Sequence, residues 1–264
     1  MRVDTGKMVI NYEERGSGEP LLLLMGLGAP GAVWELHVQE YEKHFRCLLV
    51  DNRGAGDSDQ PDGPYTTRQM AEDAVALLDK LAIERVAIAG ISMGSGIAQE
   101  IAINHPERVS RLALISSWSR CDLYTKAVFE HFKDMRACSS PEQFVRLLQL
   151  WIFAPGYFNT HAADLLEARS GAATGYMPLA AFKAQCDACI GHDTYDRLDQ
   201  IKAPSLLTVG DADIFTPLRL SEEITRRIPQ SSLKVFKGLG HAHHWEDLDA
   251  FNQLTTRFLQ TGRV

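Results

Sequence analysis

Short apolar runs that recur along the chain constrain its fold more than any other feature. Five of them are nearly uninterrupted, and they span residues 21–25, 47–50, 86–91, 112–115 and 206–209. Strands that are apolar on both faces belong to a parallel sheet covered by helices on each side. Helix-patterned segments separate most of the runs, and in the clearest, residues 67–83, one stripe carries Met70, Ala74, Leu77, Leu78 and Leu81. The pattern predicts βαβ alternation and therefore an α/β fold.

The N-terminal residues and the composition agree with this fold class. Residues 3–12 have the pattern of two strands that turn at Gly6-Lys7, which predicts an antiparallel edge ahead of the parallel strands. The 264 residues are 45% apolar and 23% charged, which suffices for a sizeable core. The sequence contains no interdomain linker, internal repeat or low-complexity segment.

The charge balance argues against two classes of partner. Lys and Arg number 27 against 34 Asp and Glu, and the resulting net charge of −7 repels phosphate backbones and anionic lipid. No apolar run approaches the roughly 18 residues of a membrane span, and the N-terminus lacks an apolar stretch of signal-peptide length. We therefore expect a small-molecule partner, and neither nucleic acid nor a membrane; the sequence allows a homo-oligomer.

The cysteines indicate a reducing compartment. Five cysteines are an odd number, and Cys47 and Cys121 lie in or next to strand-like runs, which is typical of reduced thiols in the cytoplasm. Cys186 and Cys189 form a C-x-x-C motif near His192, but a structural zinc ion needs four ligands and no second Cys/His pair has finger spacing. We therefore interpret the motif as packing and expect no metal and no cofactor.

A helical insertion interrupts the strand pattern after Ser117. Ser140, Pro141 and Gln143 form a helix start with a capping box, and other helices are expected over residues 122–136, 160–169 and 178–190. We assign residues 1–118 and 193–264 to the core and 119–192 to a cap. Residues 118–192 hold 11 of the 22 aromatic residues: Trp118, Tyr124, Phe129, Phe132, Phe144, Trp151, Phe153, Tyr157, Phe158, Tyr176 and Phe182. Packing within the cap explains most of these aromatic residues, and the remaining ones suit an apolar substrate pocket.

The chemistry starts at a G-x-S-x-G motif that follows the apolar run 86–91. Gly90 and Gly94 flank Ser92, and small residues open a helix behind them. A sharp strand-to-helix turn forces the serine into a strained conformation, and only glycines leave room for the neighbouring chain. The serine then lies at a helix N-terminus, whose amides favour developing negative charge. Ser92 is therefore the candidate nucleophile.

A serine hydroxyl needs a base, which in turn needs an acid to orient it. Gly240-His241 follows a strand-like segment, so we expect His241 to be the base, with His243 and His244 facing solvent or packing at the start of the last helix. The acid should follow the 206–209 strand. We favour Asp213 over Asp211 on its G-x-x-D spacing, and Asp122 is a weaker candidate.

An acyl-transfer site also needs two donors for the oxyanion. We expect one to be the backbone N–H of Met93, the residue after the nucleophile. The other is the N–H of Leu27, in the Gly26-Leu27-Gly28 loop after the first apolar run. A plain glycine turn is the alternative for this loop.

In order along the chain, these motifs resemble the α/β-hydrolase fold superfamily, most closely its capped carboxylesterase, lactonase (enol-lactonase) and peroxidase-like members. The resemblance covers essentially the whole chain, and its motifs are Met25-Gly26-Leu27-Gly28, residues 51–58, the Ser92 turn, residues 210–213, Gly240-His241 and Glu246. It implies a mostly parallel eight-stranded sheet flanked by helices, with the cap after strand 6, and a Ser92, Asp213 and His241 triad. One departure is Met25, where the family usually has a histidine whose imidazole anchors the oxyanion loop; a thioether forms no such hydrogen bonds.

The leading hypothesis is a serine hydrolase that cleaves a carboxylic ester or lactone of a small, largely apolar substrate through an acyl-enzyme. Gly26, Trp151, Phe153 and Phe215 are expected to line its substrate site. Two alternatives remain open, because fold does not fix function. One is a carbon–carbon bond hydrolase of ring-fission products, or a cofactor-free lyase or oxygenase, on the same triad. The other is a slow-turnover ligand sensor.

Overall fold

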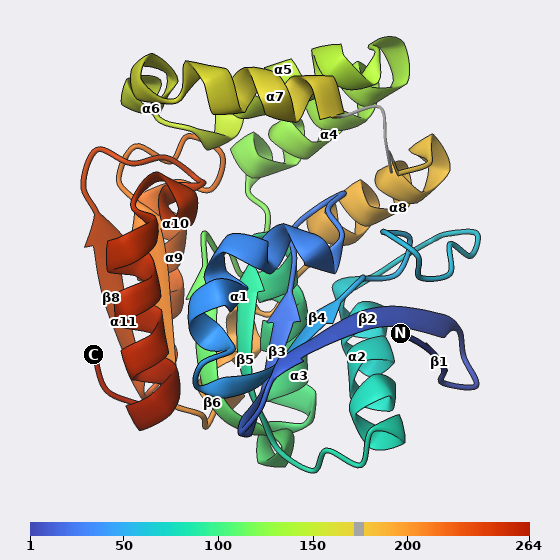
Figure 1. Cartoon of the computed structure of the whole chain (residues 1–264), viewed down its shortest axis with the longest axis vertical. Helices are drawn as coiled ribbons and strands as arrows, with labels where there is room; N and C mark the ends of the chain where they lie inside the picture. Colours follow the sequence, from blue (N-terminus) through green and yellow to red (C-terminus); the bar gives the residue numbers. More distant parts are fainter. Residues whose placement is uncertain (172–176) are drawn as a thin grey trace.

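Eight strands form a single sheet in this computed structural model, which describes residues 1–171 and 177–264 (Figure 1). The strand order is β1-β2-β4-β3-β5-β6-β7-β8. The first two strands are antiparallel to their neighbours and β3 to β8 pair in parallel, which confirms the predicted mostly parallel sheet with an antiparallel edge. The strands are β1 (Arg2–Asp4), β2 (Val9–Gly16), β3 (Glu19–Leu24), β4 (Phe45–Val50), β5 (Val86–Ile91), β6 (Val109–Ile115), β7 (Ser205–Gly210) and β8 (Ser231–Phe236).

Helices cover both faces of this sheet because its central strands are apolar on both sides. On β3, Leu21 and Leu23 pack with the residues of α1 (Glu35–Tyr41) and α11 (Leu248–Thr261), whereas Leu22 and Leu24 belong to the opposite core. That core contains the apolar stripes of α2 (Thr67–Lys80), α3 (Met93–Asn104) and α9 (Leu218–Thr225). The remaining core elements are the short helices η1 (Gly31–Trp34), η2 (Pro106–Arg108), η3 (Tyr195–Gln200) and α10 (His243–Glu246).

The helical insertion follows β6, as expected, and stands over one end of the core (Figure 1). It consists of α4 (Leu123–Cys138), α5 (Pro141–Ile152), α6 (Pro155–Thr160), α7 (Ala162–Gly171) and α8 (Leu179–Ile190). The capping box of Ser140 and Gln143 starts α5 as expected, whereas α6 had no sequence signal that we recognised. Tyr176 lies outside the described residues, and the domain bounds at 118/119 and 192/193 stay a prediction.

Across residues 1–171 and 177–264, no helix is long and apolar enough to cross a bilayer.

Candidate active site

Ser92 occupies a sharp turn between β5 and α3. Its backbone angles are φ 53° and ψ −118°, a conformation that is costly for a residue with a side chain, and its N–H donates to the Ile115 carbonyl at 2.8 Å. A Cβ atom on Gly90 would lie 2.3 Å from the Gly94 carbonyl oxygen, and one on Gly94 would lie 2.1 Å from that of Leu24. Both flanking positions therefore require glycine, and the turn holds Ser92 at the carboxyl end of the sheet.

Asp213 and His241 meet at the same end of the sheet, after β7 and β8. His241 Nδ1 lies 2.8 Å from Asp213 Oδ2, and both side chains are buried. The N–H groups of Phe215 and Thr216 each donate to Asp213 Oδ1 at 2.8 Å, and the Thr216 hydroxyl donates to Oδ2 at 2.9 Å. Because a carboxylate only accepts, the imidazole carries its proton on Nδ1 and leaves Nε2 as the acceptor nitrogen.

The other two candidate acids have different partners. Asp211 is exposed and accepts from the Gly238 N–H at 2.5 Å. Asp122 caps α4 by accepting from the Thr125 N–H at 2.8 Å, and its second oxygen pairs with Arg219. Neither contacts His241.

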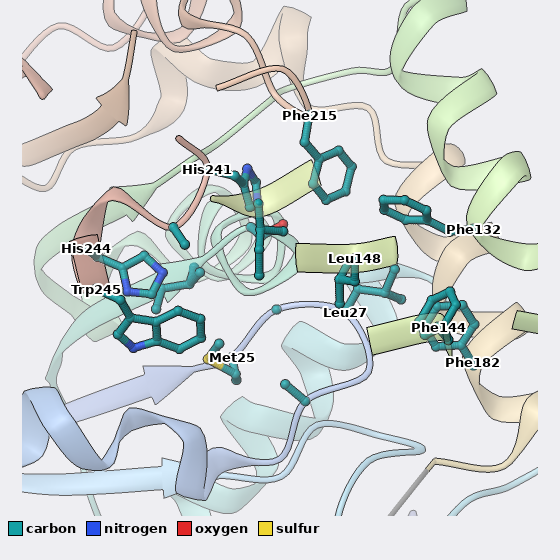
Figure 2. A pocket seen from close by; sticks show the side chains of 16 residues that line it. Met25, Leu27, Phe132, Phe144, Leu148, Phe182, Phe215, His241, His244 and Trp245 are labelled. Carbon is teal, nitrogen blue, oxygen red and sulfur yellow. The ribbon is translucent and has the colours of Figure 1, made fainter. Parts of the chain in front are cut away.

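Ser92 and His241 line one cavity between the core and the cap (Figure 2). The structure contains no direct hydrogen bond between the Ser92 hydroxyl and the His241 ring. Hydrogen bonds of this kind are often long in the absence of substrate and shorten in the reacting complex, so the geometry is compatible with proton transfer.

The two amides expected at the oxyanion position lack protein partners. Among the described residues, no acceptor binds the N–H of Leu27 or that of Met93, which is the first residue of α3. Gly26 lies against the serine, since a Cβ atom there would be 3.3 Å from Ser92 Cβ. The two donors thus belong to the two segments that meet at Ser92. The N–H of Met93 is at the N-terminal end of α3, where the helix dipole is positive.

The comparisons with known proteins agree with this geometry. A family model described as the alpha/beta hydrolase fold matches residues 19–248. The chain belongs to the α/β-hydrolase fold family. A curated relative from Azorhizobium caulinodans, named "Putative carbamate hydrolase RutD", is 28% identical, and the match covers 96% of either chain.

Two solved structures share the whole architecture of this chain. The enol-lactonase from Burkholderia xenovorans superposes with a TM-score of 0.90 at 24% identity, over 98% of this chain and 100% of that one. A thermophilic esterase from Thermogutta terrifontis has a TM-score of 0.88 at 24% identity, with both chains fully covered. At this identity the likeness shows the fold and leaves the substrate to be argued from the site.

The cap of this α/β hydrolase holds the loop of Leu27, a candidate oxyanion donor, through contacts that the sequence did not reveal. Gln185, buried on α8, accepts from the Gly28 N–H at 2.8 Å and donates from Nε2 to the Arg53 carbonyl at 2.8 Å. On the core side, Asn52 Nδ2 donates to the Met25 carbonyl at 2.9 Å. Two side-chain amides, those of Gln185 and Asn52, therefore hold the loop that begins at Met25.

The cavity of the hydrolase is almost entirely apolar. None of the described residues that line it is Asp, Glu, Lys or Arg. Its walls combine the cap with the core (Figure 2), and the lining is Met25, Gly26, Leu27, Ala29, Ile91, Ser92, Phe132, Phe144, Leu148, Ile152, Phe182, Phe215, His241, Ala242, His244 and Trp245. An apolar wall without charges favours uncharged ligands, because an ion placed there loses its hydration.

Gly26 and Phe215 are in this lining, but Trp151 and Phe153 are not, contrary to expectation. The phase of α5 explains the difference, because Phe144, Leu148 and Ile152 recur every fourth residue and occupy the face toward the cavity. Trp151 therefore packs edge-on against Phe132, with ring centroids 5.7 Å apart. Phe153 follows the end of α5 and stacks on Tyr157 at 4.6 Å.

Sequence reasoning also missed three polar residues around the site: Thr216, Gln185 and His244. Thr216 follows Asp213 in a tight turn, and this spacing predicts a contact with the Thr216 backbone. It does not predict that the Thr216 hydroxyl lies 3.0 Å from His241 Nδ1. Gln185 contacts a loop 157 residues away, for which no local signal exists. His244 was expected to face solvent or pack; it is buried and lines the cavity.

The C-x-x-C motif lies on α8, away from the lining. All five cysteines are free thiols, and burial raises the pKa of both Cys186 and Cys189. His192 is buried as well, with Nδ1 2.9 Å from the Thr67 hydroxyl. Within the described part of the chain, no group of three or more His, Cys, Asp or Glu side chains could hold a metal ion.

Proposed function

We propose that this α/β hydrolase cleaves a carboxylic ester or lactone of a small, largely apolar substrate through an acyl-enzyme on Ser92. One observation carries the proposal: the strained Ser92 turn and the buried Asp213–His241 pair share an uncharged, apolar cavity. Nucleophile, oriented base and apolar pocket are the parts that acyl transfer requires.

In the proposed mechanism, His241 Nε2 removes the proton from Ser92 as Oγ attacks the carbonyl carbon. The N–H groups of Leu27 and Met93 donate to the oxygen that becomes negative. Asp213 holds Nδ1–H and stabilises the imidazolium. His241 then protonates the leaving oxygen, and the acyl group remains on Oγ. A water molecule, deprotonated by His241, attacks this ester, and Ser92 leaves with the proton from His241.

The relatives and neighbours support this reaction class. The solved structures of similar shape are named an enol-lactonase and an esterase. The carbamate named for the curated relatives has a carbonyl that the same serine could attack. Within this proposal an uncharged carbamate fits the cavity better than a carbamate ion, which would meet no cation there. The same argument disfavours carboxylate-bearing ring-fission products. The free thiols support a cytoplasmic location as part of the proposal.

The experiment compares the purified chain with Ser92→Ala on p-nitrophenyl esters of graded acyl length, lactones, an uncharged carbamate and a ring-fission product. We expect repeated turnover of uncharged esters or lactones, lost in Ser92→Ala without loss of folding by circular dichroism. Preferred cleavage of the ring-fission product would replace the proposal by carbon–carbon hydrolysis. Turnover below one per hour on every compound would replace it by a ligand sensor.

A further inference from the structure

A second imidazole lines the cavity, and the proposed mechanism does not use it. His244, on the short helix α10, is 2% exposed and lies beside Trp245, with the edge of its ring turned toward the cavity (Figure 2). Its Nδ1 atom hydrogen-bonds to His37, whereas among the described residues nothing hydrogen-bonds to its Nε2 atom. A polar atom without a protein partner at a ligand cavity calls for an explanation.

The hydrogen bonds behind His244 determine which of its nitrogens carries the proton. The Leu36 carbonyl can only accept, so the atom of Asn252 that lies 3.5 Å from it is the donor Nδ2. The other amide atom, the acceptor Oδ1, lies 2.7 Å from His37 Nδ1. His37 Nδ1 therefore carries a proton, and its Nε2 atom has a lone pair when the ring is neutral. That lone pair accepts across 3.0 Å from His244 Nδ1. The proton of His244 is thus fixed on Nδ1, and the lone pair is fixed on Nε2.

Burial keeps both rings neutral. Desolvation lowers the pKa of His37 to about 4, and it lowers the pKa of His244 well below its usual value, an effect that the neighbouring His37 increases. Packing also fixes the orientation of His37, whose ring lies edge-on to Trp34 at 5.4 Å and to Phe251 at 5.1 Å. The relay from Asn252 through His37 to His244 is therefore a rigid, uncharged structure.

We propose that His244 Nε2 is a hydrogen-bond acceptor for the substrate, and that it selects uncharged esters or lactones with an O–H or N–H donor close to the scissile carbonyl. The proposal rests on the proposed function and names its substrate class more closely. In an apolar cavity without charged side chains, a substrate lacking the donor leaves this acceptor dehydrated and unpaired, which is costly. A substrate that carries the donor restores the hydrogen bond that water would otherwise supply.

Matched substrate pairs test the selection. On the acyl side the pair is p-nitrophenyl 3-hydroxybutanoate and butanoate, and on the alcohol side it is 2-hydroxyethyl and propyl butanoate. We expect the hydroxylated member of at least one pair to be favoured about tenfold in kcat/KM, the effect of one buried hydrogen bond. The preference should disappear in His244→Leu and return in His244→Gln, whose amide can donate to His37 and accept from the substrate. Leu148→Ala, which alters the lining without removing a polar atom, should keep the ratio.

Turnover of both members of each pair with no preference, or a preference that survives in His244→Leu, would overturn the inference. Failure to cleave any of these esters would instead overturn the proposed function. Nitrogen-15 NMR of the histidine-labelled chain gives an independent test of the relay. We expect His244 to be protonated at Nδ1 and unprotonated at Nε2, with mixed tautomers in Asn252→Leu. A proton on Nε2 in the unaltered chain would also overturn the inference.

Discussion

Two aspartates in the loop after β7 lie two residues apart, and their environments differ sharply. Asp213 is 4% exposed and bonds to His241, two backbone N–H groups and the Thr216 hydroxyl. Asp211 is exposed, and within the described part of the chain its carboxylate accepts only from the Gly238 N–H. A carboxylate that accepts from Nδ1–H fixes the imidazole tautomer with its lone pair on Nε2.

At this scale we predict that Asp213→Asn lowers kcat on the best ester by about 10⁴-fold, because an amide can donate to Nδ1 and so stabilise the wrong tautomer. Asp211→Asn is the matched control and should stay within about threefold of the unaltered chain, since its exposed hydrogen bond contributes little. Steady-state kinetics of both variants, with circular dichroism as a folding check, gives the answer. A larger loss in Asp211→Asn would mean that the acid is misassigned.

Spacing was enough to favour Asp213, because the G-x-x-D interval reflects the local turn that ends β7. The hydroxyl of Thr216 could not be predicted in the same way. Its contacts with Asp213 and His241 depend on a side-chain torsion and on a histidine 25 residues further along the chain.

Among the elements, α8 connects the cap to the proposed oxyanion donors. Gln185 is the contact, since it holds the Gly28 N–H one residue after Leu27 and also the carbonyl of Arg53. Arg53 is itself held by a buried, two-pronged ion pair with Asp73, at 2.7 Å for each hydrogen bond. The position of the loop therefore depends on a helix of the cap as well as on the core.

We predict that Gln185→Leu lowers kcat about 10- to 100-fold with a smaller change in KM, because a displaced oxyanion amide weakens the transition state more than substrate binding. Gln149→Leu is the matched control: Gln149 is also buried in the cap, but its amide donates to the Leu165 carbonyl. The Gln149→Leu variant should be less stable than the unaltered chain but should keep its kcat. Equal kcat values for Gln185→Leu and the unaltered chain would show that the loop needs no support from the cap.

Element by element, the sequence was informative where signals are local. The capping box of α5 and the apolar runs of β3 to β7 depend on neighbouring residues and were predicted correctly. The rotation of α5 was not predicted, so Trp151 and Phe153 were expected to line the cavity. Their positions depend on which face of α5 meets the core, and that is decided by packing with α4 and Phe182.

At the scale of the whole molecule, burial lowers the pKa of four histidines: His37, His192, His243 and His244. Desolvation lowers the pKa of His37 and His192 to about 4 and that of His243 to about 3, and it lowers that of His244 well below its usual value. An unfolded histidine titrates near 6.5. As the pH falls below that value, the unfolded chain takes up these protons before the folded chain does, so folding stability decreases.

We predict that the free energy of unfolding falls by several kcal/mol between pH 7 and pH 4.5, since His37 and His192, with pKa values lowered to about 4, each contribute roughly 2 kcal/mol over that interval. Chemical denaturation at several pH values measures it. His192→Gln should reduce the fall in the free energy of unfolding by the contribution of one histidine. His131→Gln, on the exposed side of α4, should leave this pH dependence unchanged. A stability that does not change over this interval would contradict the prediction.

Covalent capture of the acyl group tests the central claim of this account most directly. The chain is mixed with excess p-nitrophenyl butanoate, quenched in acid within the first turnovers, and examined by intact mass spectrometry and peptide mapping. We predict one added butanoyl group, located on the peptide that contains Ser92 and absent from Ser92→Ala. A butanoyl group on another residue, or one that persists in Ser92→Ala, would contradict it.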